Sequence, residues 1–216
     1  AAARFMNRWW MRMQAWTFLP VVNGVFVHLF WMYYLHPKKV FNRLCAARTR
    51  EQHTSSAFEL VCMFASHVTL PLIFYSGGGG GILWSYFLLT VVNFWNFIYL
   101  FGHFSLSHTF TDVVPETKHL LWFEYALHHT VNISTRSALV SWVMGYLNFQ
   151  IEHHLFPSMP QHKNALAAPY VRAFCERHAP ALKYTEHSYK DAWRLMFSNL
   201  NQVGKHYYEN GTAIER

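Results

Sequence analysis

A stretch of 21 residues without a single charged side chain, 82–102, is the strongest constraint on how this chain can fold. About 20 apolar residues in a helix suffice to cross the roughly 30 Å of hydrocarbon in a bilayer. A second apolar run, 57–75, precedes it and is joined to it through Ser76 and the five glycines 77–81. The pattern predicts a tight hairpin of two antiparallel membrane-spanning helices.

The composition agrees with a membrane setting. The 216 residues are 52% hydrophobic and 19% aromatic, and only 13% are charged, whereas roughly 25% of the residues of soluble domains are charged. The net charge of +7 would suggest nucleic acid in a soluble protein. Here the lysines and arginines flank apolar runs, where lipid headgroups explain them, so we expect no nucleic-acid partner. The three cysteines are far apart and indicate neither a disulfide framework nor a zinc ribbon.

The distribution of basic residues gives the hairpin an orientation. Residues 38–50, just before the first apolar run, contain five lysines and arginines. The positive-inside rule places such a segment in the cytosol. Because the hairpin returns to the same side, we expect its far end, near His103 and His108, to be cytosolic.

Residues 16–35 are also long enough to cross a bilayer, but basic residues stand on both sides of them. Arg12 before the segment and Lys38 after it both favour the cytosolic side. Pro20 and Gly24 would weaken a straight helix. We therefore expect an interfacial or re-entrant helix, with a third span as the alternative.

The remainder of the chain is more polar and predicts a helical cap in the cytosol. Helices are expected near residues 119–131, 137–154, 163–178 and 187–208, with Ala179-Pro180 separating the last two. The expected fold class is thus all-α: an integral membrane protein with a two-span hairpin, an interfacial or re-entrant helix and a cytosolic cap.

A metal-ligating pattern lies at the end of the second of these cap helices. Gln150, His153 and His154 stand at positions i, i+3 and i+4, so a helix places all three on one face. Neutral imidazole binds iron, zinc, copper and nickel, and spacing alone does not select among these ions. The pattern predicts a metal-binding face.

Residues 148–157, Asn-Phe-Gln-Ile-Glu-His-His-Leu-Phe-Pro, resemble the third histidine box of the membrane fatty acid desaturases. They are most similar to the front-end group, in which glutamine replaces the first histidine of that box. The resemblance continues into residues 14–20 upstream and into residues 158–162 and 182–184 downstream. The HxxxH and HxxHH boxes of the family, and the His-Pro-Gly-Gly haem motif of a fused cytochrome b5 domain, do not occur in residues 1–216.

The resemblance implies a centre of two irons (a diiron centre) held by histidines, which uses O₂ to desaturate an acyl chain. In the family a histidine at the end of the last span also binds metal, and Leu-Ser-His-Thr at 106–109 resembles that position. No catalytic residue is expected beyond the metal ligands. The implied ligands are His108, His153, His154 and, more weakly, Gln150. The candidates for supporting contacts are His129, Asn132 and His103.

Two of these supporting candidates have equally ordinary explanations. His103 lies about 140° round a helix from His108, so it would not share its direction and could instead be a hydrogen-bonded interfacial histidine. His129 could equally be a surface residue. Asn132 belongs to a Trp, Thr and Asn frame that resembles front-end desaturases, although Ala126 stands where many of them have glutamine.

The implied activity is the introduction of a cis double bond into a fatty acyl chain within the lipid bilayer. Electrons would come from cytochrome b5 and its NADH-dependent reductase, neither of which this segment encodes. The location implied is the endoplasmic reticulum membrane, with multiple spans and cytosolic histidines. Sphingolipid desaturases and related hydroxylases share this plan and remain alternatives, as does a non-catalytic membrane protein with a structural metal site.

The whole chain, 1–216, is expected to be the C-terminal part of one desaturase domain, with a membrane part near 14–108 and a metal-binding cap near 109–216. Because two of the three boxes of the family are absent from it, residues 1–216 alone should neither hold two irons nor turn over.

This expectation is tested by measuring iron per chain in purified residues 1–216 reconstituted with ferrous iron. We expect fewer than two irons per chain, because the ligands present are too few for two ions. Two irons bound stoichiometrically would refute the expectation, and the same protein with His153 and His154 replaced by alanine gives the background.

Overall fold

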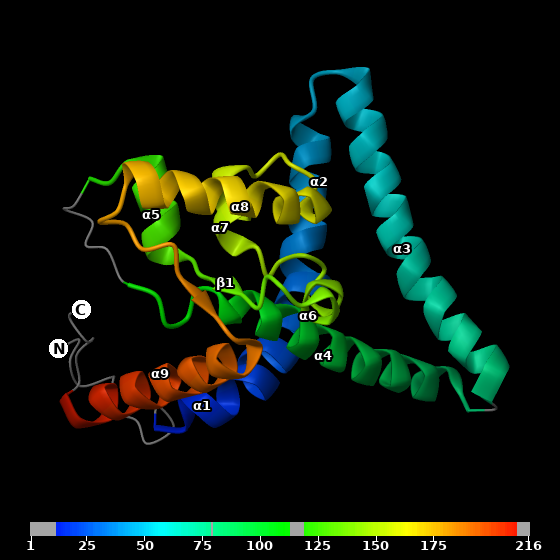
Figure 1. The fold of residues 1–216 in the computed structure, drawn as a ribbon. Coiled ribbons are helices and arrows are strands. Elements are labelled where there is room, and N and C mark those ends of the chain that lie inside the picture. The colour runs from blue at the N-terminus through cyan, green and yellow to red at the C-terminus, as the bar shows by residue number, and fades with distance from the viewer. Residues whose placement is uncertain (1–11, 79, 113–118, 211–216) are drawn as a thin grey trace. The chain divides into compact units, whose positions relative to one another are not determined.

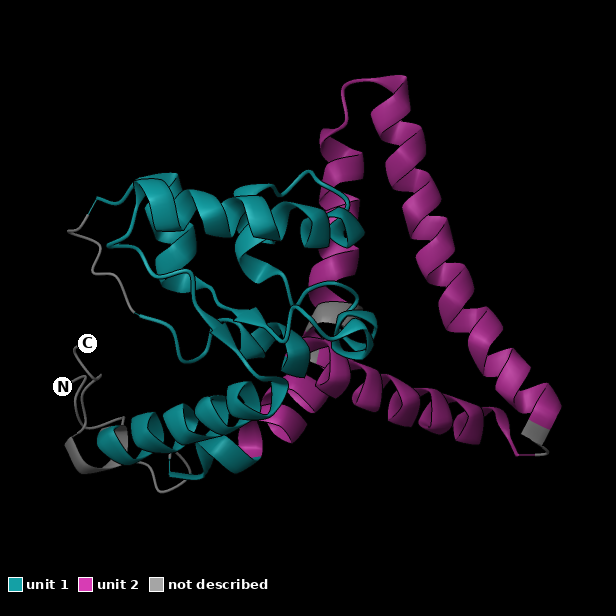
Figure 2. Cartoon of the chain, viewed as in Figure 1, with its two compact units in different colours: residues 1–16, 102–216 teal, residues 17–101 magenta. Residues whose placement is uncertain are grey.

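The computed structural model describes residues 12–78, 80–112 and 119–210 (Figure 1). The chain divides into two compact units, one of residues 17–101 and one of residues 1–16 and 102–216, which is called the unit of residues 102–216 below (Figure 2). The expected boundary between membrane part and cap was residue 108. Each unit is considered by itself below.

The described part of the unit of residues 17–101 is helical apart from short connections. Its helices follow one another closely along the chain, and only short connections separate α2 from α3 and α3 from α4. They are η3 (Phe18–Leu35), α2 (His36–Ala46), α3 (Arg50–Gly78) and α4 (Ile82–Leu106). The short helix α1 (Gln14–Thr17) precedes them and ends at the first residue of the unit.

Two of the described helices, α3 and α4, are long and apolar enough to cross a membrane, as predicted. Their large apolar side chains point outward: Phe64 is 74% exposed and Leu83 is 83% exposed. Such surface would be costly in water, and lipid tails remove that cost. Near the glycine connection the Tyr86 hydroxyl donates to the carbonyl oxygen of His67 at 3.1 Å, which joins the two helices.

The segment 16–35, expected to be interfacial or re-entrant, forms η3, which has the wider winding of a π-helix. It is not one of the two helices that meet the criteria of length and hydropathy for a span. Gly24 of η3 lies against α4 so closely that a β-carbon there would come within 2.4 Å of the Phe94 ring. The absent side chain is therefore what allows this contact.

Helices α2 and α3 are held together by a carboxylate from the apolar helix. Glu59 of α3 accepts a hydrogen bond from His36 at 3.1 Å and forms an ion pair with Arg43, both on α2. A carboxylate within an apolar helix needs such partners.

The described part of the unit of residues 102–216 combines the short helices α5, α6 and α7 with the longer helices α8 and α9 and two short strands. The elements are α5 (Trp122–His129), β1 (Asn132–Ile133), α6 (Ala138–Val143), α7 (Gln150–Leu155), α8 (Gln161–His178), β2 (Glu186–His187) and α9 (Tyr189–Asn210). Leu127, Ile151, Val171 and Cys175 form a buried cluster that joins α5, α7 and α8. The predicted helices near 163–178 and 187–208 are confirmed as α8 and α9.

The expectation of an all-α fold is correct for most of the chain, but the structure adds two short strands. Strands β1 and β2 pair in parallel, with Asn132 opposite Glu186 and Ile133 opposite His187. Two-residue strands are too short to produce the alternating pattern by which strands are recognised in a sequence.

The single helix expected over 137–154 is wrong, because α6 and α7 are separate. Gly145 and Tyr146 adopt positive φ angles of 56° and 64°, which no continuous right-handed helix allows. The Asn148 side chain donates to the Ile133 carbonyl oxygen and to the Ser141 hydroxyl, each at 3.1 Å. These bonds fix the loop against β1 and set where α7 begins.

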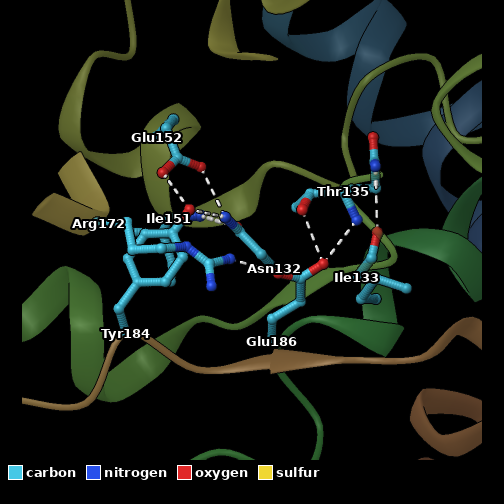
Figure 3. A network of polar contacts seen from close by, with 9 residues as sticks. Asn132, Ile133, Thr135, Ile151, Glu152, Arg172, Tyr184 and Glu186 are labelled. Carbon is cyan, nitrogen blue, oxygen red and sulfur yellow. Dashed lines mark hydrogen bonds and ion pairs between the residues drawn. The ribbon is translucent and has the colours of Figure 1, made fainter. Parts of the chain in front are cut away.

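Glu186 fastens β2 to the loop after β1 (Figure 3). One of its oxygens accepts from the backbone amide of Thr135 at 2.8 Å and from the hydroxyl at 2.7 Å, and the other forms an ion pair with Arg172 of α8. Partial burial would raise the pKa of Glu186, but the Thr135 and Arg172 bonds together hold that pKa below its ordinary value.

Replacing Gly24 by alanine should destabilise the unit of residues 17–101 by about 1–3 kcal/mol, because the new methyl group would overlap the Phe94 ring. Thermal unfolding in detergent measures the effect. Gly77→Ala is the matched control, since a β-carbon there meets nothing within 4 Å. Helix propensity alone would make both variants more stable, so equal or raised unfolding temperatures would contradict the proposed contact. Adding Phe94→Leu to Gly24→Ala should recover part of the loss.

The Glu186 contacts predict a pH-dependent stability. The pKa of Glu186 in the folded protein lies below its ordinary value of 4.5, so the carboxylate stabilises the fold above that pH and its contribution disappears as the pH falls through the lowered pKa. Glu186→Gln should lower the free energy of unfolding at pH 7 by about 1 kcal/mol or less, because Arg172 is partly exposed, and this appears as a lower unfolding temperature. The difference from the native protein should shrink below pH 4.5. A pH-independent difference, or the same difference in the exposed-site control Glu176→Gln, would contradict this assignment.

Candidate metal centre

Helix α7 carries the residues of the predicted metal-binding face. It starts at Gln150 and ends at Leu155, and its N-cap residue Phe149 supplies no side-chain hydrogen bond. Gln150, His153 and His154 share one side of this helix, while Ile151 is fully buried in the core cluster on another. Packing on one side therefore leaves the other side free for polar chemistry.

His108, from the turn that follows α4, joins the face presented by α7. Its Nδ1–H donates to the backbone carbonyl oxygen of His129 at 3.0 Å. That bond assigns the proton to Nδ1 and leaves the lone pair on Nε2. The Nε2 atom faces the side-chain amide of Gln150 at 3.0 Å.

The Gln150 amide lies between two imidazole nitrogens. Its Nε2 is 3.0 Å from Nε2 of His108 and 3.3 Å from Nε2 of His154, so it donates to both lone pairs. The centroids of the two rings are 5.1 Å apart. A half-turn of the amide about its terminal bond would present its oxygen to the same point. Two imidazole lone pairs and one amide oxygen can thus converge on one small volume.

The electrostatics keep these imidazoles neutral. Desolvation by burial, with smaller contributions from His108, His153 and His129, lowers the pKa of His154 to about 4. Desolvation likewise lowers the pKa of His108 below its ordinary value. Both rings are therefore uncharged at neutral pH, which is the form that binds a metal.

The surroundings of His153 also fit a metal. Its Nδ1 is buried and has no hydrogen-bond partner, and the centroid of its ring is 5.8 Å from that of His154. A buried nitrogen without a partner costs free energy that a metal ion would offset. Within residues 12–78, 80–112 and 119–210, no group of three or more histidine, cysteine, aspartate or glutamate side chains is arranged around a single point. The donors fit a histidine-bound metal, and they would need further ligands to complete it.

The three candidates for supporting contacts have different surroundings. His129 contributes its backbone carbonyl to His108, while its ring packs on Tyr125 with centroids 4.1 Å apart. The His103 ring instead hydrogen-bonds the Tyr189 hydroxyl of α9 at 2.9 Å, so its direct contact is with α9.

Asn132 contacts α7 directly. Tyr184, which the sequence did not single out, bonds to the same part of α7 (Figure 3). The Asn132 amide donates to Glu152 Oε2 at 2.8 Å and to the Tyr184 hydroxyl at 2.7 Å, and its oxygen accepts from the backbone N–H of Ile151 at 2.9 Å. Tyr184 donates to Glu152 Oε1 at 2.8 Å. Glu152 is fully buried.

This network accounts for a carboxylate in the interior. Burial raises the pKa of Glu152, and the bonds from Asn132 and Tyr184 act in the opposite direction. No sequence signal pairs Glu152 with Tyr184, because they are 32 residues apart and on different elements. The nearest signal was the resemblance around residues 182–184, which assigned no role to the tyrosine.

The sequence is similar to those of one family of known proteins. The sequence model of the family described as Fatty acid desaturase matches residues 1–186. An acyl-lipid (8-3)-desaturase of Thraustochytrium sp is 38% identical over 201 residues, and one of Rebecca salina is 36% identical over 194 residues. Each match covers 90% of this chain and 41% of the other protein. Fatty acid desaturase 3 of Bos taurus is 31% identical over 163 residues, which cover 71% of this chain and 35% of that protein.

The chain thus spans less than half the length of the curated relatives it matches. No solved structure matches it. The family match covers most of the residues and includes α7 and His108, where the imidazoles converge. The chain belongs to the fatty acid desaturase family.

Proposed function

We propose that the complete protein is a front-end desaturase, which uses O₂ and two irons to introduce a cis double bond between an existing double bond and the carboxyl end of a fatty acyl chain. The observation that carries the proposal is the convergence of His108 and His154 on Gln150, with both imidazoles neutral. Family membership favours desaturation as the use of that face.

In this proposal His108, His153 and His154 bind iron through imidazole nitrogens, and Gln150 is a weaker ligand or donates to one. When bound, the irons supply the oxidising power that no side chain has, which is needed to remove hydrogen from an unactivated methylene. The chain's own residues orient the imidazoles and keep them unprotonated. Further ligands would come from parts of the complete protein beyond these 216 residues, since the relatives are more than twice as long as the matched region.

The relatives and the spans favour particular partners and a location. Two of the relatives are named acyl-lipid desaturases, which favours an acyl chain carried on a lipid within the bilayer. Cytochrome b5 and its NADH-dependent reductase would supply electrons. The basic segment 38–50 favours cytosolic histidines in the endoplasmic reticulum membrane.

The test is to express the complete protein in a host that lacks polyunsaturated fatty acids, to supply unsaturated precursors and to analyse the lipids by gas chromatography with mass spectrometry. We expect a new double bond on the carboxyl side of an existing one. His154→Ala should abolish the product, because it removes one of the converging nitrogens. His162→Ala is the matched control: this histidine is exposed on α8 and should leave the product unchanged.

Unchanged lipids, despite good expression and iron supply, would contradict desaturation and favour a structural metal site. A double bond in the long-chain base of ceramides, or a hydroxylated product, would replace the fatty acyl assignment by a sphingolipid desaturase or a hydroxylase.

A further inference from the structure

We infer that Tyr184 is a positioning residue for the metal centre: through Glu152 and Asn132 it fixes the rotation of α7 and thereby the direction in which His153 and His154 point. The inference rests on the proposed function, because it concerns the same metal-binding face. It adds a residue that neither the histidine pattern nor the family resemblance assigned.

The geometry of a helix places this contact opposite the ligands. Successive residues are about 100° apart round the axis, so Gln150, His153 and His154 lie within about 100° of one another. Glu152 projects from the other side of the same turn. A small rotation of α7 would therefore move Glu152 and the imidazoles in opposite directions, and fixing one fixes the other.

Helix α7 cannot hold this rotation by itself. It comprises only Gln150–Leu155, and its N-cap residue Phe149 supplies no side-chain hydrogen bond. Isolated helices of this length are unstable. The buried Ile151 anchors α7 to the core. Apolar contacts are non-directional, however, so this anchor does not define the rotation of the helix. Hydrogen bonds to Glu152 are directional, so they specify the angle.

The network on Glu152 is closed. Both hydrogens of the Asn132 amide are used, one on Glu152 and one on the Tyr184 oxygen, and the Tyr184 hydrogen goes to the other Glu152 oxygen. Asn132 also accepts from the backbone N–H of Ile151. Removing the Tyr184 hydroxyl would leave one buried carboxylate oxygen and one amide hydrogen without this partner, and the resulting cost favours movement of α7.

The ring of Tyr184 also packs against Arg172, which lies outside the network around Glu152 (Figure 3). The guanidinium carbon of Arg172 lies 4.7 Å from the centroid of its ring, and Arg172 is paired with Glu186 of β2. The ring therefore keeps its place when the hydroxyl is removed, so Tyr184→Phe tests the hydrogen bond and leaves the packing intact.

The experiment uses the complete protein in detergent and compares Tyr184→Phe with Tyr170→Phe. Tyr170 lies on α8 with 80% of its surface exposed, so the same chemical change there is a matched control. Three quantities are measured: iron per protein after challenge with a chelator, the visible spectrum of the cobalt(II)-substituted protein, and the unfolding temperature of the metal-free protein.

We expect Tyr184→Phe to weaken iron binding about 10- to 100-fold, as loss of a supporting contact commonly does, and to alter the cobalt spectrum. Tyr170→Phe should match the native protein in both. Glu152→Gln, which keeps the size of the side chain but replaces one acceptor oxygen by a donor, should change the spectrum in the same direction as Tyr184→Phe.

The possible failures are distinct. If the native protein binds iron and Tyr184→Phe lowers only the unfolding temperature, with unchanged iron retention and cobalt spectrum, the tyrosine stabilises the fold without positioning the ligands and the inference is wrong. If the native complete protein binds no iron, the proposed function fails and the inference fails with it.

Discussion

The side chain of Asn132 is the contact on which the cap most depends. It uses its oxygen on the backbone of Ile151 and its two hydrogens on Glu152 and Tyr184, while its backbone N–H bonds to the Thr185 carbonyl oxygen at 3.0 Å. It thereby links β1, the start of α7 and the segment leading into β2. The amide of Asn132 is fully buried, and all its donors and acceptors are satisfied. The arrangement of elements that satisfies them is therefore lower in free energy than arrangements that leave some unpaired. A short helix that would otherwise be unstable acquires a defined orientation in this way.

The two units are stabilised by different physical effects. In the unit of residues 17–101 the apolar side chains of α3 and α4 point outward, and lipid must solvate them. Within that unit, the packing of Gly24 on Phe94 specifies how η3 lies against α4, and the bonds of Glu59 specify how α3 lies against α2. In the other unit apolar side chains are buried inside the protein, among them the cluster of Leu127, Ile151, Val171 and Cys175, and polar networks determine the orientation of the elements.

The sequence predicted the parts of the structure that depend on local pattern. The spans α3 and α4, the helices α8 and α9 and the shared face of Gln150, His153 and His154 all follow from runs and spacings of a few residues. It could not predict the break between α6 and α7, which depends on the positive φ of Tyr146 and on long-range bonds of Asn148. The same holds for the pairing of β1 with β2, because the register of two-residue strands is set by their surroundings.

The candidate metal centre depends both on local sequence pattern and on contacts between residues far apart in the chain. Spacing places two imidazoles on α7, but their chemical form depends on groups far along the chain: the His129 carbonyl assigns the tautomer of His108, and desolvation lowers the pKa of His154 to about 4. Keeping neutral, partly buried imidazoles aligned in the absence of metal costs free energy, since Gln150 serves the lone pairs of His108 and His154 while the buried Nδ1 of His153 has no hydrogen-bond partner. The contacts behind the ligands must offset that cost. This is a physical reason for finding a polar network of Asn132, Tyr184 and Glu152 on the opposite side of α7.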